Sequence, residues 1–364
     1  MTELIVHKSE PLNAETPLAS LAEAFITPAR LFYIRTHGDI PRLDVAQHRL
    51  RVEGLVSEPL DLSMEELRSR FPRRVVTATL QCAGNRRAEL SEIAPVSGTQ
   101  WGPGAIGTAD WAGVALADVL RAAGIWDDTA AELHVAFEAA DMVSKEGRQF
   151  TFGTSIPLAK ALSSEVLLAD EMNGAPLAPE HGLPLRAVVP GYIGARSPKW
   201  LTAIRVQDKP SANYFQQMDY KLYPSWMSPE GIDPQAGATL CEFPLNAVIC
   251  SPADGAIVPA GPVMLRGYAV ASGRPIERVE ISTDSGRHWA RAETEARHGE
   301  RWTWVLWTAR IDLPPGDYEL IVRAWDGAAQ TQPERAEHVW NPKGYVAGAW
   351  HRLRVRVGEG PLTP

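Results

Sequence analysis

The sequence has few cysteines: Cys82, Cys241 and Cys250 are three thiols in 364 residues. An odd and sparse set of this kind does not make a disulfide framework, so we expect a reducing compartment. Positive charge is also scarce, because the formal net charge is -8 and the isoelectric point is about 5.7. A chain with this balance lacks the overall basic field that attracts nucleic acid or an anionic membrane, and we expect neither as a partner.

Long apolar runs are missing as well. The N-terminal segment MTELIVHKSEPLNAETPL contains no apolar run of signal-peptide length and no twin-arginine motif. Nowhere in the chain is there a stretch of roughly 18 uninterrupted apolar residues, the length that a membrane helix requires. These absences predict a cytoplasmic protein. The 45% hydrophobic content is nevertheless sufficient for a sizeable core, and the length suits two domains.

The first two-thirds of the chain mix helix and strand patterns. RVVTATL at 74–80 has the composition of a buried strand, and SMEELRSRF at 63–71 that of a short helix capped by Ser63. Leu116, Val119 and Leu120 share one helical face before Gly124 ends the helix. GPGAIG at 102–107 matches a nucleotide-binding pattern in letters only, since no strand precedes it, and we interpret it as a loop.

After an extended connection at 209–240, the pattern changes to the period of two that is typical of strands. It shows in three runs with turn signals between them, namely Val279, Ile281 and Thr283, then Trp302, Trp304 and Leu306, then Tyr318, Leu320 and Val322. We therefore expect an α+β domain at 1–240 and an immunoglobulin-like β-sandwich at 241–364, with its strands at about 242–358. HRLRVRV near the C-terminus predicts a half-buried strand.

The segment LQCAGNRR at 80–87 is the most informative for chemistry. Cys82 ends a strand, a glycine follows, and Arg86 and Arg87 could lower the pKa of a thiol and bind anions. A buried structural cysteine is one interpretation, and a nucleophile served by His37, His134 or His181 is another. Zinc is disfavoured because CxxC and HExxH are absent. A soft ligand for a metal whose other ligands come from a cofactor remains a third interpretation.

LQCAGNRR and APEHGLPLRAVVPGYIGARSPKWL at 178–201 closely resemble the molybdenum-cofactor domain of sulfite oxidases and of assimilatory nitrate reductases. FYIRTHGDIP at 32–41, FGTSIPLAKAL at 152–162 and LLADEMNG at 167–174 resemble further blocks of the same family. GYAVASG and WNPKGYVAGAWHRLRV resemble its dimerisation domain. The resemblance therefore implies an α+β molybdenum-cofactor domain of sulfite oxidase type, followed by the sandwich as dimerisation domain.

The resemblance also implies site residues. Cys82 would be the protein ligand of molybdenum beside the dithiolene of the pterin cofactor. Other residues fall in blocks that grip the pterin and its phosphate, for which arginine forks and a lysine charge are chemically suited. They are Arg35, His37, Asp141, Ser155, His181, Arg186, Arg196 and Lys199. In the substrate pocket, the resemblance implies Arg35, Arg87 and Trp101.

Three positions depart from the family pattern as we match it. Asp170 in LLADEMNG replaces a tyrosine beside the metal, Ser97 replaces a lysine, and Val305 replaces an arginine from the sandwich. We therefore predict Asp170 as a fourth catalytic residue. Since these changes remove positive charge and add a carboxylate, they predict weak binding of a doubly charged anion such as sulfite.

The resemblance implies a homodimeric enzyme that transfers an oxygen atom to or from a small oxyanion or sulfur-containing substrate, with sulfite as the default. A reductase of nitrate or of an S-oxide is the alternative within enzymes, and a non-catalytic binding protein is the alternative of another class. The chain has no CxxCH motif and no segment that resembles a haem-binding domain. We therefore expect a separate electron acceptor, such as a cytochrome.

Overall fold

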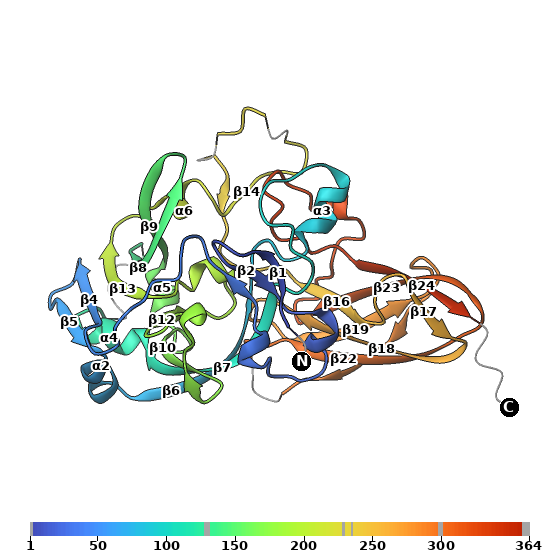
Figure 1. Cartoon of the computed structure of the whole chain (residues 1–364), viewed down its shortest axis with the longest axis horizontal. Helices are drawn as coiled ribbons and strands as arrows, with labels where there is room; N and C mark the ends of the chain where they lie inside the picture. Colours follow the sequence, from blue (N-terminus) through green and yellow to red (C-terminus); the bar gives the residue numbers. More distant parts are fainter. Residues whose placement is uncertain (1–2, 127–131, 228–229, 234–235, 298–300, 359–364) are drawn as a thin grey trace.

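The computed structural model describes residues 3–126, 132–227, 230–233, 236–297 and 301–358. Figure 1 shows an elongated molecule with a mixed α+β part at one end and a β-sandwich at the other. Within the described ranges, no helix combines the length and apolar character needed to cross a membrane.

Two five-stranded sheets form most of the α+β part. The first has the order β11-β10-β7-β6, and β12 also pairs with β10. Its strands are β6 (Arg73–Gln81), β7 (Ile106–Ala115), β10 (Leu167–Met172), β11 (Ala175–Pro176) and β12 (Arg186–Val188). The second has the order β5-β4-β13-β8-β9. Its strands are β4 (Arg49–Gly54), β5 (Leu60–Ser63), β8 (His134–Lys145), β9 (Arg148–Pro157) and β13 (Leu201–Gln207).

Short elements cover and connect these sheets. The N-terminal sheet contains β1 (Ile5–Lys8), β2 (Asn13–Glu15) and β3 (Ile34–Arg35), and the connection to the sandwich contains β14 (Lys221–Leu222) and β15 (Ala238–Thr239). The α-helices are α1 (Leu18–Leu21), α2 (Met64–Arg70), α3 (Arg87–Ile93), α4 (Leu116–Ala122), α5 (Leu158–Ala161) and α6 (Tyr214–Gln217). Single 3-10 turns are η1 (Ala29–Leu31), η2 (Pro179–His181), η3 (Gly194–Arg196) and η4 (Ala336–His338).

Local sequence signals explain several of these boundaries. The Ser63 side chain accepts a hydrogen bond from the Glu66 backbone while Glu66 bonds back to Ser63, which makes the start of α2 a capping box. Gly124, at φ 85°, follows α4 in the left-handed backbone conformation that glycine favours. Residues 102–105 form a loop, as predicted for GPGAIG, but the last two residues of that segment, Ile106 and Gly107, already belong to β7.

The sandwich consists of a four-stranded and a five-stranded sheet, with strand orders β16-β18-β22-β21 and β17-β24-β23-β19-β20. Its strands are β16 (Asn246–Ser251), β17 (Ala256–Pro259), β18 (Gly261–Val270), β19 (Ile276–Ser282), β20 (Ala290–Arg291), β21 (Glu293–Glu295), β22 (Val305–Leu313), β23 (Gly316–Asp326) and β24 (His351–Gly358). Alternate residues of the strands fill its core, among them Val279, Ile281, Leu320 and Val322. Trp302 and Trp304 precede β22 instead of lying within it, because they pack toward the α+β part.

The two parts share a large apolar cluster. Leu21 and Phe25 near the N-terminus belong to the same buried cluster as Val248, Tyr268 and Trp304 of the sandwich. A truncation that removes the sandwich would therefore expose to water the apolar side chains of this cluster that belong to the α+β part. Such a truncation is therefore unsuited as a test of where the dimer contact lies.

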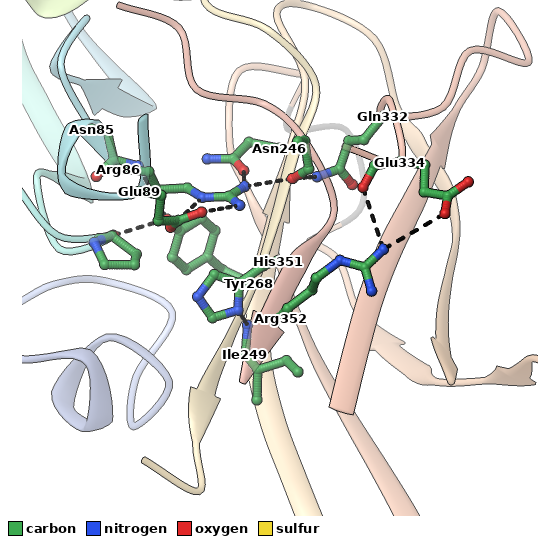
Figure 2. A network of polar contacts seen from close by, with 12 residues as sticks. Asn85, Arg86, Glu89, Asn246, Ile249, Tyr268, Gln332, Glu334, His351 and Arg352 are labelled. Atoms are coloured by element: carbon green, nitrogen blue, oxygen red, sulfur yellow. Dashed lines mark hydrogen bonds and ion pairs between the residues drawn. The ribbon is translucent and has the colours of Figure 1, made fainter. Parts of the chain in front are cut away.

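Polar side chains also cross between the parts. Figure 2 shows Arg86, which follows the Cys82 strand, held between Glu89 of α3 and Asn246 of β16. Arg86 also donates to the Ala349 carbonyl at 2.8 Å, and 1% of its surface is exposed. The loop that carries Cys82 is thus attached directly to the sandwich.

Candidate active site

Cys82 stands at the end of β6, where the chain turns into α3. Its backbone N–H donates to the Ala105 carbonyl at 2.9 Å, and its own carbonyl accepts from Asn85 N–H at 3.0 Å. The Asn85 side chain in turn accepts from Ala105 N–H. Because the loop is bonded on both sides of the cysteine, the thiol is held in a fixed position, 7% exposed.

Two hollows meet at Cys82. The inner hollow is lined by residues from β3, β8, η2 and the segment from η3 to β13. The outer hollow opens between β1, β8, the loop at 97–101 and the segment at 343–345. Arg35, His37, Cys82 and Tyr220 line both hollows. A group bound in the inner hollow would therefore present its reactive end to the outer hollow at Cys82.

Positive charge collects on the wall of the inner hollow. Arg186 is 5% exposed and donates to the carbonyls of His181 and Ser197, and the Lys199 ammonium donates to the Glu180 carbonyl at 2.7 Å. Burial lowers the pKa of Arg186 to about 10. The pKa of Lys199 is well below its ordinary value, through burial first and the nearby Arg186 second. Buried cations of this kind favour an anionic ligand.

Two further predicted residues line the inner hollow. Asp141 is 3% exposed, and its Oδ1 atom is buried without a hydrogen-bond partner among the described residues. Burial raises the Asp141 pKa to about 6, although Lys199 opposes the shift. Nε2 of His181 lies 3.0 Å from the Ala29 carbonyl, and burial lowers the His181 pKa to about 4. The unpartnered acceptor fits a ligand with N–H donors.

His37 and Tyr220 make a direct contact where the hollows meet. The His37 Nε2 atom lies 2.6 Å from the Tyr220 hydroxyl, and the imidazole stacks on Phe152. Burial, followed by Arg35, holds the pKa of His37 well below its ordinary value, and burial raises the pKa of Tyr220 to about 12. Both groups are therefore neutral at pH 7, and the contact is an uncharged hydrogen bond that orients the phenol beside Cys82.

The outer hollow contains the predicted substrate residues Arg35, Arg87 and Trp101, together with the exposed Ser97. The Arg87 side chain donates to the carbonyls of Thr99 and Gly344. A Cβ atom at Gly98, where φ is +102°, would lie 2.7 Å from the Arg87 guanidinium. This position therefore has to remain without a side chain for Arg87 to keep its place.

Asp170 does not lie in either hollow, so its predicted catalytic role is wrong. On β10, its carboxylate accepts from Arg68 Nε at 2.6 Å and from Arg73 Nη1 at 2.9 Å. Asp170 is 3% exposed, and its two partners come from α2 and the start of β6. The carboxylate therefore connects three elements of the α+β part, and the weak sulfite binding that we expected from it loses its basis.

Three other predicted positions also lie outside both hollows. Arg196 is fully buried and donates to Thr154, to Gln216 and twice to the Leu240 carbonyl, so its donors are used within the protein. Ser155 Oγ accepts from the Ser211 backbone at 2.8 Å. Neither residue lines the two hollows, so their predicted contact with the cofactor stays a prediction that the geometry does not support. Val305 packs in the sandwich core, so matching it to a pocket arginine was wrong.

Tyr220 and Lys343 are among the residues of the outer hollow that were not predicted from the sequence. A tyrosine does stand beside Cys82, namely Tyr220, and the sandwich part does supply a cation, namely Lys343. Tyr220 lies in the stretch that we interpreted as a connection, where the density of aromatic residues in YFQQMDYKLYP was the available signal. Lys343 lies in WNPKGYVAGAW, which we used only for the resemblance.

The residues present fit the molybdenum-pterin cofactor that the resemblance implies. The buried Arg186 and Lys199 suit its phosphate, the unpartnered Asp141 oxygen suits the N–H groups of its pterin ring, and the Cys82 thiol supplies a soft ligand for the metal. Among the described residues there is no cluster of three or more His, Cys, Asp or Glu side chains that could bind a metal ion without a cofactor.

Comparison with known proteins agrees with this geometry. Residues 37–215 match the family model described as the oxidoreductase molybdopterin binding domain, and residues 238–358 match the Mo-co oxidoreductase dimerisation domain. The fold and the site thus define a molybdopterin-dependent oxidoreductase.

The matches to whole proteins narrow this class. The chain is 41% identical to sulfite oxidase of Gallus gallus over 96% of its own length and 77% of that protein, and 42% identical to sulfite oxidase of Arabidopsis thaliana over 99% and 95%. The crystal structure of the sulfane dehydrogenase SoxCD from Paracoccus pantotrophus aligns with a TM-score of 0.80 and 28% identity, over 98% of this chain and 86% of that one. The chain belongs to the sulfite oxidase family.

The protein is therefore a molybdenum-dependent oxidoreductase, and its cofactor is the molybdenum-pterin cofactor. The predicted fold class is confirmed, including the dimerisation domain after the cofactor domain. The alternative of a non-catalytic binding protein is set aside by the same matches.

Proposed function

We propose that the protein oxidises sulfite to sulfate, taking the added oxygen from water and passing two electrons to a separate acceptor. The observation that carries this proposal is the meeting of two hollows at Cys82, one suited to the cofactor and the other lined by the cations Arg35, Arg87 and Lys343. These cations attract a small oxyanion into the outer hollow. There the anion reaches Cys82, next to which the cofactor would bind.

The side chains of the protein bind the substrate and the cofactor and orient them. When bound, the cofactor supplies the two-electron oxygen-atom transfer, which no side chain here can perform. Arg35 and Arg87 hold the sulfite oxygens by charge-assisted hydrogen bonds. Tyr220, oriented by His37, places an uncharged hydroxyl next to them. Trp101, fully buried on the wall, excludes water and strengthens these electrostatic contacts.

In the inner hollow, Arg186 and Lys199 would hold the anionic end of the cofactor, and Asp141 would accept from its ring N–H groups. The thiolate of Cys82 would bind the metal. Direct cofactor contact by His37 and His181 also stays a proposal, supported by their place on the wall of this hollow.

The test uses protein purified from a host that makes the cofactor, with molybdenum measured per chain. Sulfite should reduce an added one-electron acceptor, such as ferricyanide or a cytochrome c, in a molybdenum-dependent reaction. The same preparation with a reduced dye and nitrate tests the reductase alternative, since the chain is also 38% identical to inducible nitrate reductase of Glycine max over 95% of its length and 41% of that protein. Turnover of nitrate but not sulfite by fully loaded protein would refute the proposal.

We also propose a homodimer formed through the sandwich, supported by the match of residues 238–358 to a dimerisation domain. Light scattering of the whole chain should give twice the mass of one chain, and a monomer at micromolar concentration would contradict it. A cytoplasmic location and a cytochrome as acceptor stay predictions, which fractionation of the native cells and reduction assays with their isolated cytochromes would test.

A further inference from the structure

Asp219 is an acidic residue on the wall of a hollow that is otherwise suited to anions. It immediately precedes Tyr220 and lines the outer hollow together with Cys82. Its Oδ2 lies 2.6 Å from the Lys145 ammonium and its Oδ1 lies 3.1 Å from the Lys343 ammonium. One carboxylate thus holds two lysines of the hollow, one from the end of β8 and one from the sandwich part.

Burial strengthens the two ion pairs of Asp219. The Asp219 side chain is 12% exposed, so solvent screens its two ion pairs less than pairs on the surface. Burial acts to raise the Asp219 pKa, but Lys145 and Lys343 outweigh it and the pKa is lowered, so the carboxylate is ionised at neutral pH. The other charged residues that line the hollow are Lys8, Arg35, Arg87 and Glu146.

Glu146 differs from Asp219 in its contacts. It is exposed, and its carboxylate accepts a hydrogen bond from the Tyr214 hydroxyl at 2.8 Å. Its negative charge therefore lies on the solvent side of the hollow, where water and salt screen it. Asp219 is the carboxylate that directly competes with an incoming anion for the lysines.

We propose that Asp219 acts as an internal counter-ion, occupying Lys145 and Lys343 so that the outer hollow holds small divalent oxyanions only weakly. This inference rests on the proposed oxidation of sulfite, because there the product is sulfate, a dianion of nearly the same size as the substrate. A hollow with two free lysines would retain the product. When Asp219 is present, its carboxylate competes with bound sulfate for the two lysines. Sulfate is therefore displaced and leaves the hollow.

The test measures sulfate binding to the molybdenum-loaded protein by calorimetry, and sulfite kinetics in parallel. Asp219→Asn removes the charge and keeps the size of the side chain. We expect the sulfate Kd to fall by roughly tenfold at low ionic strength, with a parallel fall in the inhibition constant of sulfate, and the gain to shrink as potassium chloride is added. Glu146→Gln is the matched control, with the same change in net charge, and it should change the sulfate Kd by no more than about twofold.

Equal sulfate affinity in wild type and Asp219→Asn, both fully loaded with molybdenum, would overturn the proposal, and so would an equal gain in Glu146→Gln. Should Asp219→Asn fail to fold, the same comparison is made between Lys343→Gln and the double variant Asp219→Asn/Lys343→Gln, where the carboxylate faces Lys145 alone. Tighter sulfate binding in the double variant supports the counter-ion, and unchanged binding refutes it. Tighter binding without any sulfite turnover in wild type would refute the proposed function and leave the counter-ion in place.

Discussion

Replacing Arg86 by glutamine should destabilise the protein more than a typical surface substitution. The Arg86 guanidinium makes bonds of 2.8 and 2.7 Å to the Glu89 carboxylate, 2.7 Å to Asn246 Oδ1 and 2.8 Å to the Ala349 carbonyl. Glutamine cannot reach all of these acceptors. Because it retains a Cβ atom, the left-handed backbone at φ 66° is no more strained than in wild type.

The size of the loss in stability depends on the hydrogen-bond acceptors that lose Arg86 as their donor. Asn246 is 0% exposed, so its buried Oδ1 atom loses its donor at a cost of about 1–3 kcal/mol, whereas the Ala349 carbonyl keeps the hydrogen bond from the Gln332 side chain at 3.1 Å. The Glu89 side chain is 31% exposed and regains water, so its contribution is smaller. We expect a loss of about 2–4 kcal/mol in the free energy of unfolding, somewhat less than the loss of about 3–5 kcal/mol for a fully buried ion pair, because the Glu89 side of this pair is open to water.

The assay is denaturant unfolding of wild type and variant, followed by tryptophan fluorescence. Arg356→Gln is the matched control, since Arg356 pairs with Asp317 on the surface and the two side chains are 69% and 73% exposed. It should leave the free energy of unfolding close to that of wild type, because exposed ion pairs contribute little to stability. Arg86→Gln within about 1 kcal/mol of this control would show that the contacts in Figure 2 do not stabilise the fold as argued.

Three further predictions concern single residues. Cys82→Ser should lose molybdenum and sulfite oxidation while circular dichroism stays unchanged, because a hydroxyl is a harder ligand than a thiolate; activity within a few-fold of wild type would contradict the assignment. Asp141→Asn should stabilise the cofactor-free protein at pH 8 but not at pH 4. The folded pKa of Asp141, about 6, is above its unfolded value of 3.8, so ionisation weakens folding as pH rises between them, by up to about 3 kcal/mol; equal gains at both pH values would refute this. Asp170→Asn should lower stability by about 1–3 kcal/mol through Arg68 and Arg73, and a fully loaded variant should keep sulfite kcat/KM within about twofold; a tenfold change would restore a catalytic role.

Elements with local signals were predictable from the sequence. The strand that became β6, the capped helix α2 and the end of α4 at Gly124 each depend on residues within a few positions of one another. The sandwich strands followed from their alternation. Trp302 and Trp304 obeyed the same alternation but lie before the strand, since a contact with the α+β part determines their position.

The site residues that lie in long motifs were predictable from the sequence, and the other site residues were not. Cys82 and the inner-hollow residues came from extended matching blocks. Asp170 was misplaced because a short block does not determine which face of the sheet a side chain takes, and the pairing of β10 with β7 is irregular between Ala169 and Glu171. Tyr220 could not be found by periodicity, since tertiary contacts with His37 and Tyr345 fix its place.

The apolar cluster shared by the two parts also limits how such chains can change in evolution. Leu21 and Phe25 pack with Tyr268 and Trp304, so a volume change on one side is felt on the other. A sandwich transplanted from a relative would arrive without side chains shaped for this cofactor part, although the two parts match separate family models. Chimeras joined at the boundary between those models should therefore fold only when the N-terminal segment is exchanged together with the sandwich.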